Sequence, residues 1–250
     1  MTAVARGVPD EADRIEAVAV VVPARNEERL LPRCLDALGG ALSRLSVERP
    51  DVLAVAVVVL DSCTDRTRQV AADRSFVTTL SVDAACVGTA RAAGADHVER
   101  SHRTRPDNLW LLTTDADSAV PADWLTSHVD LAEGGFDAVV GTVEPDPADL
   151  SALVLDRWHG QHRMVLGHGH VHGANLGMRL SAYAAAGGFE SLRTHEDVRL
   201  VRRLRRNGAR VLATPHVPVL TSGRTEARAP GGFAAYLSAL VDGDAVAEHR

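Results

Sequence analysis

The stretch LWLLTTDAD, residues 109–117, joins an apolar run directly to two carboxylates that are separated by one alanine. The apolar run is typical of a buried strand in a parallel sheet. Open α/β sheets bind their ligands at the carboxyl ends of the strands, which is where Asp115 and Asp117 lie. Two carboxylates are costly there unless they bind a cation or accept strong hydrogen bonds. The stretch therefore predicts an α/β sheet with an acidic, cation-binding edge.

The same alternation of apolar runs and helical patterns extends to both sides of this stretch. Strands are predicted at residues 17–23, 52–60, 77–82, 108–114 and 136–143. One helix is predicted from Asn26, which we expect to cap its first turn, to Gly39, and a second one from the loop at 61–65 through residue 72. Two more are predicted from Gly88 to about Glu99 and from Pro121 onward. Such alternation predicts a doubly wound, mostly parallel sheet with helices on both faces.

After Pro145 the alternation becomes less regular. The pattern predicts a helix over 147–166, a Gly/His-rich stretch over 167–173, a strand over 174–180, a short helix over 181–186, an amphipathic helix around 198–204, a strand over 210–214, a polar loop over 221–230 and a closing helix over 233–241. We expect residues 1–16 to form a flexible leader, with 17–145 and 146–250 as two halves of one domain.

Composition narrows the class of protein. The 250-residue chain is 46% hydrophobic and 24% charged, as soluble globular proteins are. A formal charge of −6 argues against nucleic-acid binding, which needs clustered positive charge. Three scattered cysteines suit free thiols in a reducing compartment. Without a signal-like start or an apolar run of bilayer length, we expect a soluble cytoplasmic protein with no transmembrane segment.

Further motifs occur in a recognisable order: VVVPARNEE (20–28), LDSCTD (60–65), Asp115-Ala116-Asp117, GAN (173–175), GGF (187–189) and ED (196–197). Over residues 17–224 the chain resembles glycosyltransferase family 2, whose fold is the Rossmann-like GT-A fold. The resemblance implies transfer of a hexose from a nucleoside-diphosphate sugar, of the UDP or GDP type, to a hydroxyl. The acceptor would be a small molecule or lipid-linked, and it would bind to the half that begins at residue 146.

The resemblance also implies which residues bind the nucleotide: Pro23, Ala24, Arg25, Glu27, Asp61, Ser62, Arg91 and Asp115. The residue types leave other roles open. Asp61 and Ser62 can cap a loop, and Arg91 can be a solvated helix arginine.

For the metal, the resemblance implies Asp117 as a ligand of Mg²⁺ or Mn²⁺, with Asp115 on the metal or the ribose; such hard cations prefer oxygen ligands. A third ligand is not evident, although His216 lies in a plausible region. Arg224 is a candidate phosphate ligand. In the family the Asp of the ED motif is the general base, which implies Asp197 as base, Glu196 as its support, and inversion at the anomeric carbon. The row His168, His170 and His172, which would share one strand face, suits an acceptor site or solvent better than a second metal.

Two other functions compete with this interpretation. A phosphatase of the haloacid dehalogenase type also carries an Asp-x-Asp pair at a strand tip. That pair usually opens the domain, however, and the chain has no lysine to bind phosphate. A non-catalytic sugar-nucleotide-binding protein is the second alternative, and the presence of Asp117 and Asp197 argues against it.

Overall fold

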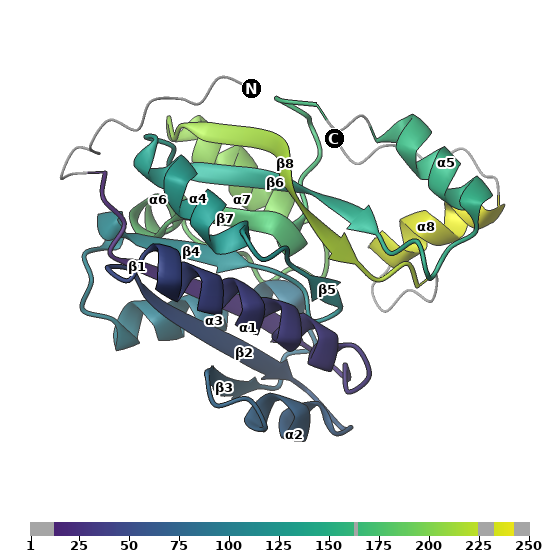
Figure 1. The fold of residues 1–250 in the computed structure, drawn as a ribbon, viewed down its shortest axis with the longest axis horizontal. Coiled ribbons are helices and arrows are strands. Elements are labelled where there is room, and N and C mark those ends of the chain that lie inside the picture. The colour runs from purple at the N-terminus through teal and green to yellow at the C-terminus, as the bar shows by residue number, and fades with distance from the viewer. Residues whose placement is uncertain (1–12, 163–164, 225–232, 243–250) are drawn as a thin grey trace.

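The computed structural model describes residues 13–162, 165–224 and 233–242. These contain an eight-stranded sheet with the order β3-β2-β1-β4-β7-β6-β8-β5 (Figure 1). Its strands are β1 (Ala17–Ala24), β2 (Leu53–Asp61), β3 (Val77–Val82), β4 (Leu109–Thr113), β5 (Ser118–Ala119), β6 (Ala138–Pro145), β7 (Leu176–Arg179) and β8 (Val211–Thr221). The β1–β2, β2–β3, β1–β4 and β6–β8 pairs are parallel, whereas β7 is antiparallel to both neighbours and β5 to β8. The predicted α/β class with a mostly parallel sheet is confirmed.

Helices cover both faces of the sheet. They are α1 (Leu31–Glu48), α2 (Thr67–Ala72), α3 (Val87–Ser101), α4 (Trp124–Glu133), α5 (Ala152–Gln161), α6 (Leu180–Ala185), α7 (Glu196–Arg206) and α8 (Phe233–Asp242), with 3₁₀ turns η1 (Pro106–Asn108) and η2 (Gly173–Asn175). The buried side chains of α1 and α4 belong to one hydrophobic cluster and those of α3, α6 and α7 to another. Each face of the sheet therefore has its own core.

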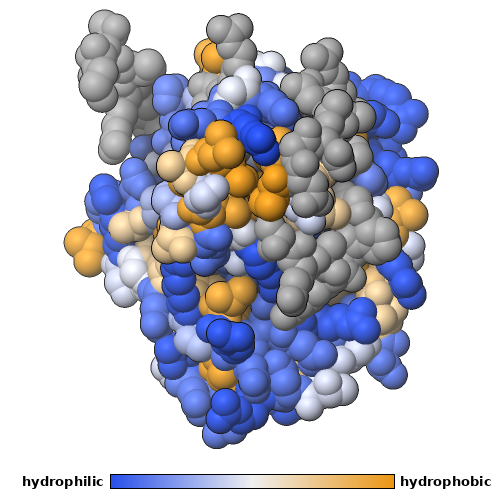
Figure 2. All heavy atoms as spheres, turned by 90° about the vertical axis from the view of Figure 1, so that its right-hand side faces the viewer, coloured by the Kyte–Doolittle hydropathy of each residue, from blue (hydrophilic) through white to orange (hydrophobic). Residues whose placement is uncertain are grey.

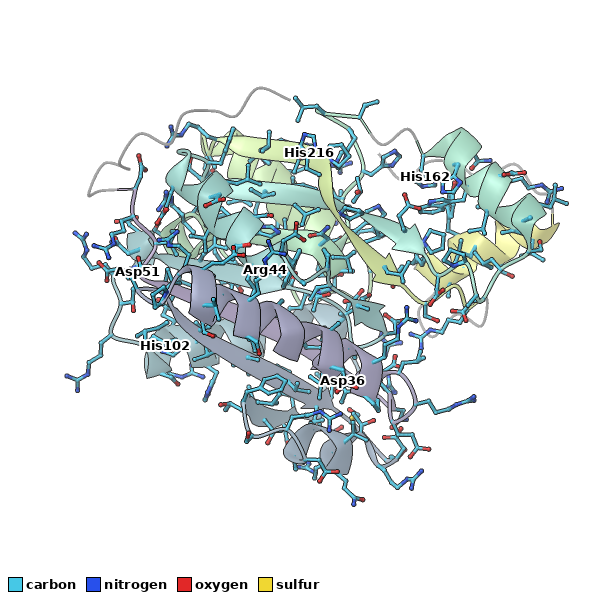
Figure 3. The ribbon with its side chains drawn as sticks, viewed as in Figure 1. Asp36, Arg44, Asp51, His102, His162 and His216 are labelled. Carbon is cyan, nitrogen blue, oxygen red and sulfur yellow. The ribbon has the colours of Figure 1, made fainter. Side chains whose placement is uncertain are left out.

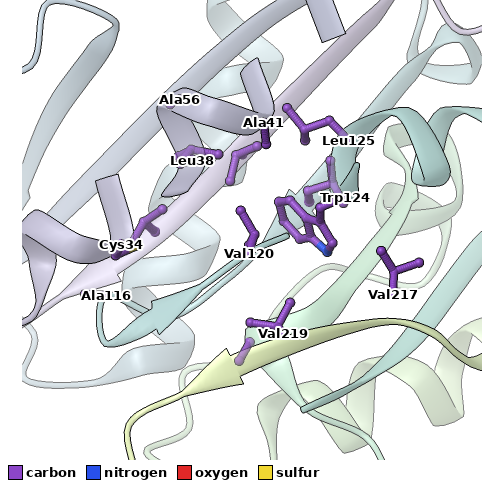
Figure 4. Close-up of a cluster of buried hydrophobic side chains, with 14 of the residues drawn as sticks. Cys34, Leu38, Ala41, Ala56, Ala116, Val120, Trp124, Leu125, Val217 and Val219 are labelled. Carbon is purple, nitrogen blue, oxygen red and sulfur yellow. The ribbon is translucent and has the colours of Figure 1, made fainter. Parts of the chain in front are cut away.

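Strand β1 shows how the sequence builds both cores. Val18, Val20 and Val22 belong to the α1 side, while Ala19 and Val21 belong to the α3 side, and all five are buried. This is the alternation that a strand imposes on successive side chains. Figure 4 shows part of the α1-side core, where α1 meets Trp124 of α4 and the last residues of β8. A central strand buried on both faces fixes the position of the loop that follows it.

The start of α1 differs from the prediction. The helix begins at Leu31 rather than at Asn26, and Leu30 occupies its N-cap position without a side-chain hydrogen bond. Asn26 has a positive φ of 53°, and its Oδ1 accepts hydrogen bonds from the Thr64 N–H at 2.8 Å and from the Thr64 hydroxyl at 3.3 Å. The side chain therefore fastens the loop after β1 to the loop after β2, and a short side chain tolerates that backbone.

Several later boundaries also differ. α5 covers ten residues instead of the predicted 147–166, because Ser151 caps its start by accepting from the Val154 N–H and the chain leaves the helix at His162. β8 runs to Thr221 instead of ending at 214, since it continues alongside β6. The row from His168 to His172 is not a strand. The predicted loop at 221–230 lies mostly outside the described residues.

At the amino end, residues 1–12 of the expected leader lie outside the described residues. Ile15 is fully buried, its N–H donates to Glu133 Oε1 at 3.1 Å, and the Glu16 N–H donates to the Asn108 carbonyl at 2.9 Å. The packed part of the chain therefore starts before β1.

Helices α5 and α8 lie together at one end of the molecule, beside the last residues of β6 and β8 (Figure 1). Figure 2 looks onto this end and shows apolar side chains gathered in the middle of a mainly hydrophilic face. Leu153 of α5 and Val241 of α8 are among the exposed apolar residues of the two helices. In the described part of the chain no helix is both long and apolar enough to span a bilayer.

Candidate active site

A cavity of about 400 Å³ opens at the carboxyl ends of β1, β2 and β4. Ser62 and His216 do not line it, whereas the following predicted site residues do: Pro23, Ala24, Arg25, Glu27, Asp61, Arg91, Asp115, Asp117, Glu196, Asp197 and Arg224. They come from loops and helix starts that are far apart in the sequence, and the sheet brings them together because parallel strands end at the same edge.

The loop after β1 meets the end of the described β8 region through an ion pair. Glu27 is 6% exposed, and its two carboxylate oxygens accept from the guanidinium of Arg224 at 3.1 and 3.0 Å. The same guanidinium lies 2.8 Å from Asp117 Oδ2. Burial and, after it, the charge of Asp115 raise the pKa of Asp117 to about 6, against the opposing effect of Arg224. Arg224 therefore neutralises two carboxylates that come from different parts of the chain.

Asp61 at the end of β2 holds the start of α3. Its Oδ1 accepts from the backbone N–H groups of Ala84 and Ala85 at 2.9 and 2.8 Å, and its Oδ2 accepts from that of Cys86 at 2.8 Å. Burial alone raises the pKa of Asp61, but the three donors outweigh burial and leave the pKa below its usual value. Asp61 is thus a charged loop anchor whose side chain also faces the cavity.

Arg91 of α3 lies between two acidic elements. It is 3% exposed; one guanidinium nitrogen donates to Asp115 Oδ1 at 2.5 Å and another to Glu196 Oε1. Burial raises the pKa of Glu196, against the effect of Arg91. A buried guanidinium between carboxylates fixes their relative positions through charge-assisted hydrogen bonds.

Asp197 lies in the first turn of α7, where the helix dipole favours a negative charge. Its Oδ2 accepts from the Gly173 N–H at 2.6 Å and its Oδ1 from the Val198 N–H at 2.7 Å. Burial raises the pKa of Asp197, with Arg91 acting in the opposite direction. Each oxygen retains a lone pair for a further partner. A carboxylate held in this way, with a raised pKa, has the properties of a general base.

Strained backbone gathers around the same cavity. Among the described residues, the non-glycine residues with positive φ are Asn26, Ser62, Ala85 and His195, at 49–63°. They stand after β1, after β2, before α3 and before α7, in the loops that form the site. Such conformations concentrate at functional sites and cost about 1–3 kcal/mol each for Ser62, Ala85 and His195, whereas the short polar side chain of Asn26 tolerates them.

Carboxylates outnumber guanidinium groups in this network. It contains the side chains of Glu27, Asp115, Asp117, Glu196 and Asp197 against those of Arg91 and Arg224. Burial and, second to it, the neighbouring charge of Asp115 raise the pKa of Asp117, so crowding contributes to this shift. Within the described ranges no three His, Cys, Asp or Glu side chains gather into a complete protein metal site. Asp115 and Asp117 fit a divalent cation that keeps water and takes its other ligands from substrate phosphates, as Mg²⁺ commonly does.

Another wall of the cavity consists of rings. Trp158 of α5 stacks on His162, with 3.4 Å between ring centroids and 12° between planes, and Figure 3 labels His162 at the end of α5. Phe233 and Tyr236 of α8 meet Trp158 edge to face at 5.2 and 5.8 Å. His172 meets Phe233 at 6.4 Å, and burial lowers the pKa of His172 to about 3, so its ring is neutral. The rings of this wall meet both stacked and edge to face, and those of Trp158, Phe233, Tyr236 and His172 are uncharged.

Two predicted residues lie away from the cavity. Ser62 does not line it; its single hydroxyl hydrogen is within reach of Asp83 Oδ1 at 2.7 Å and of Asp61 Oδ1 at 3.1 Å. His216, labelled in Figure 3, is exposed on β8 and is not among the lining residues. The structure also shows a role that the sequence analysis did not assign. Gly173 of the GAN motif links three elements, because its carbonyl accepts from Thr113 Oγ1 at 2.6 Å while its N–H donates to Asp197.

Similar structures place this fold among the GT-A glycosyltransferases. TarS 1–349 from S. aureus matches with a TM-score of 0.59 and 14% identity over 84% of this chain and 61% of that one. The mannosyltransferase PcManGT from Pyrobaculum calidifontis, in complex with GDP-Man and Mn²⁺, matches with a TM-score of 0.59 and 20% identity over 93% and 70%. Glucosyl-3-phosphoglycerate synthase from Mycobacterium tuberculosis, in complex with Mn²⁺, UDP and phosphoglyceric acid, matches with a TM-score of 0.51 and 15% identity over 90% and 77%.

These likenesses show the fold, and the chain spans less than two thirds of TarS 1–349. The sequence itself gives the narrower assignment, because the model of glycosyl transferase family 2 matches residues 19–181. The chain belongs to glycosyl transferase family 2, as the motif order predicted. No curated protein matches it.

Proposed function

We propose that this protein transfers a hexose from a nucleoside-diphosphate sugar to an acceptor hydroxyl, with inversion at the anomeric carbon and with the help of a divalent cation. The observation that carries the proposal is the convergence of Asp115, Asp117 and Asp197 on one cavity in a chain of this family. Solved relatives of the same fold contain GDP-Man or UDP together with Mn²⁺, which supports a donor of the UDP or GDP type.

The donor would lie along the edge formed by β1, β2 and β4. The loop at Pro23, Ala24 and Arg25 lines this side of the cavity, and Asp61 closes it. Asp115 and Asp117 would hold Mg²⁺ or Mn²⁺, which supplies positive charge against the leaving diphosphate. Arg224 is the phosphate-binding side chain of the proposal, because its fork of N–H donors suits phosphate oxygens as well as carboxylates.

Asp197 would act as the general base. The acceptor oxygen attacks the anomeric carbon, its proton passes to a carboxylate oxygen of Asp197, and the bond from that carbon to the diphosphate oxygen breaks with its electron pair on the diphosphate. The raised pKa of Asp197 suits this step, since a base that binds its proton more tightly drives the transfer further. A single displacement of this kind inverts the anomeric configuration.

The acceptor would lie against the ring wall of Trp158, His162, His172, Phe233 and Tyr236. Both α5 and α8 belong to the half after residue 145, which supports the assignment of that half to the acceptor. The uncharged rings of Trp158, Phe233 and Tyr236 suit the apolar face of a sugar or another ring better than a highly charged acceptor. The free cysteines suit a reducing compartment, so a cytoplasmic reaction is part of the proposal.

The haloacid dehalogenase alternative is disfavoured by the family match and by the pairing of Asp115, which would be its nucleophile, with Arg91. A non-catalytic binding protein differs from the proposal only in turnover, so binding and turnover need separate measurements.

Thermal unfolding tests the donor site. The protein is melted with UDP, GDP, TDP and their sugar conjugates, each in Mn²⁺ or in EDTA. We expect one base to stabilise the fold, more strongly with Mn²⁺, by about 3 kcal/mol at a ligand concentration near 100 times Kd. Asp117→Asn should lose the Mn²⁺-dependent part, whereas Asp36→Asn, on the exposed surface of α1 (Figure 3), should keep it. The absence of stabilisation by any nucleotide would contradict the proposal.

A further inference from the structure

The arrangement around Arg91 suggests a role beyond the nucleotide contact predicted for it. We propose that Arg91 is a positioning residue that ties Asp115, after β4, to the acidic pair at the start of α7. It acts on turnover through Asp197 rather than through binding of the nucleotide. This inference rests on the function proposed above.

The first argument is that the guanidinium is committed to carboxylates on both sides. Asp115 accepts from one nitrogen and Glu196 from another, and the side chain of Arg91 is 4% exposed. Glu196 is as deeply buried as Arg91. Two buried charges remain in such a place only when they satisfy each other. Arg91 therefore holds β4 and α7, two elements of opposite sides of the site, at a fixed separation.

The second argument is that the backbone of Gly173 is shaped around Arg91. A Cβ at Gly173 would lie 2.5 Å from the Arg91 guanidinium carbon, closer than real Cβ contacts. The same Gly173 donates its N–H to Asp197 Oδ2. Arg91, Gly173 and Asp197 thus form one packed unit, and any shift of the guanidinium is transmitted to the residue that orients the base. A glycine is required there for the close approach rather than for its backbone angles.

The third argument is that the segment before α7 packs against the start of α3 and fixes the position of that helix. The N–H of Gly88 in its first turn donates to the Leu192 carbonyl at 3.0 Å, and a Cβ at Gly88 would lie 2.0 Å from the Glu190 carbonyl oxygen. The Phe189 ring lies 5.9 Å from the guanidinium carbon of Arg91. The segment that leads into α7 therefore rests directly on the turn of α3 that carries Arg91.

A double-mutant cycle tests the proposal, with turnover of the donor as one readout and the Kd of its nucleoside diphosphate as the other. Arg91→Gln is expected to lower kcat about 100-fold, the cost of displacing a catalytic group by about 1 Å. The same change in an Asp197→Asn background is expected to cost less than about threefold, because groups that act as a unit are not additive. Nucleotide Kd should stay within about threefold in both backgrounds.

Conservative and matched variants complete the design. Arg91→Lys keeps the positive charge but loses the planar, paired N–H donors of the guanidinium, so it should recover only part of kcat. Gly173→Ala removes no charge and should reproduce the kcat loss by displacing the guanidinium, so it decides the question if Arg91→Gln does not fold. Arg100→Gln, on the exposed last turn of the same helix, should leave both readouts unchanged.

Two results would overturn the assignment. Equal losses from Arg91→Gln with and without Asp197 would show that Arg91 does not act through the base. A weakened nucleotide Kd with unchanged kcat would show that Arg91 contacts the donor. Failure of the proposed function looks different, because Asp197→Asn alone would then keep its full rate and the base assignment itself would fall.

Discussion

Substitution of Asp117 by asparagine should stabilise the protein in the absence of divalent cations. Burial, and then Asp115, raise the pKa of Asp117 to about 6 from an ordinary value of 3.8. The folded state therefore holds this proton more tightly than the unfolded state. The resulting stability is complete below pH 3.8 and is lost as pH rises through 6. Two pKa units at about 1.4 kcal/mol each give a cost of up to about 3 kcal/mol at neutral pH, which Asp117→Asn removes.

Urea unfolding in EDTA between pH 4 and pH 8 measures this effect. Wild type and Asp117→Asn should be equally stable near pH 4, and the variant should become more stable by up to about 3 kcal/mol above pH 6. Mn²⁺ should then stabilise the wild type more than the variant, since a cation relieves the same crowding of charge. Asp36→Asn, whose carboxylate is mostly exposed, should follow the wild type within about 0.5 kcal/mol. Free energies of unfolding that change in parallel with pH for wild type and variant, or a variant that is less stable at pH 7, would refute the electrostatic account of the site.

Three further changes probe single interactions. Asp61→Asn should lower the free energy of unfolding by about 1–3 kcal/mol, because an amide nitrogen would face backbone N–H donors, and denaturant titration at pH 7 measures it. Burial lowers the pKa of His128 to about 4, so the stability that its neutral form provides is present above pH 6.5 and is lost as pH falls towards 4. Over this range the free energy of unfolding of His128→Gln should fall by about 3 kcal/mol less than that of the wild type. An equal fall would refute the role of burial. Arg224→Gln should weaken nucleoside-diphosphate binding about tenfold or more in calorimetry, because a charged donor is lost, and unchanged affinity would remove Arg224 from the phosphate site.

The fold was predictable because its strands are short apolar runs with polar residues at their carboxyl ends. Val20 and Val21 face different cores, so β1 is buried on both faces. Such a strand is an uninterrupted apolar run in the sequence and is easily recognised. The antiparallel direction of β7 could not be read from the sequence in the same way. Its residues are all buried, as in a parallel strand, and only pairing with β4 and β6 sets its direction.

The site was predictable as a set of residues but not as a network. Motif order placed Asp61, Asp117 and Asp197 at one edge of the sheet, and the cavity contains all three. The pairing of Arg224 with Glu27 joins positions 197 residues apart, and no local pattern encodes such a contact. The role of Gly173 likewise depends on the guanidinium that comes to lie against it. The motifs thus predicted which residues gather at this edge, and tertiary packing determined their partners.

The most direct test of the account is the fate of the sugar nucleotide when it is incubated with the protein, Mn²⁺ and a panel of glycoside acceptors. Proton NMR of the product reports both transfer and the anomeric configuration. We expect release of nucleoside diphosphate, an inverted anomeric centre, and a rate that falls about 100-fold or more in Asp197→Asn. A product with the donor's configuration, or an Asp197→Asn variant as fast as the wild type, would contradict the central claim that Asp197 is the base of an inverting glycosyl transfer.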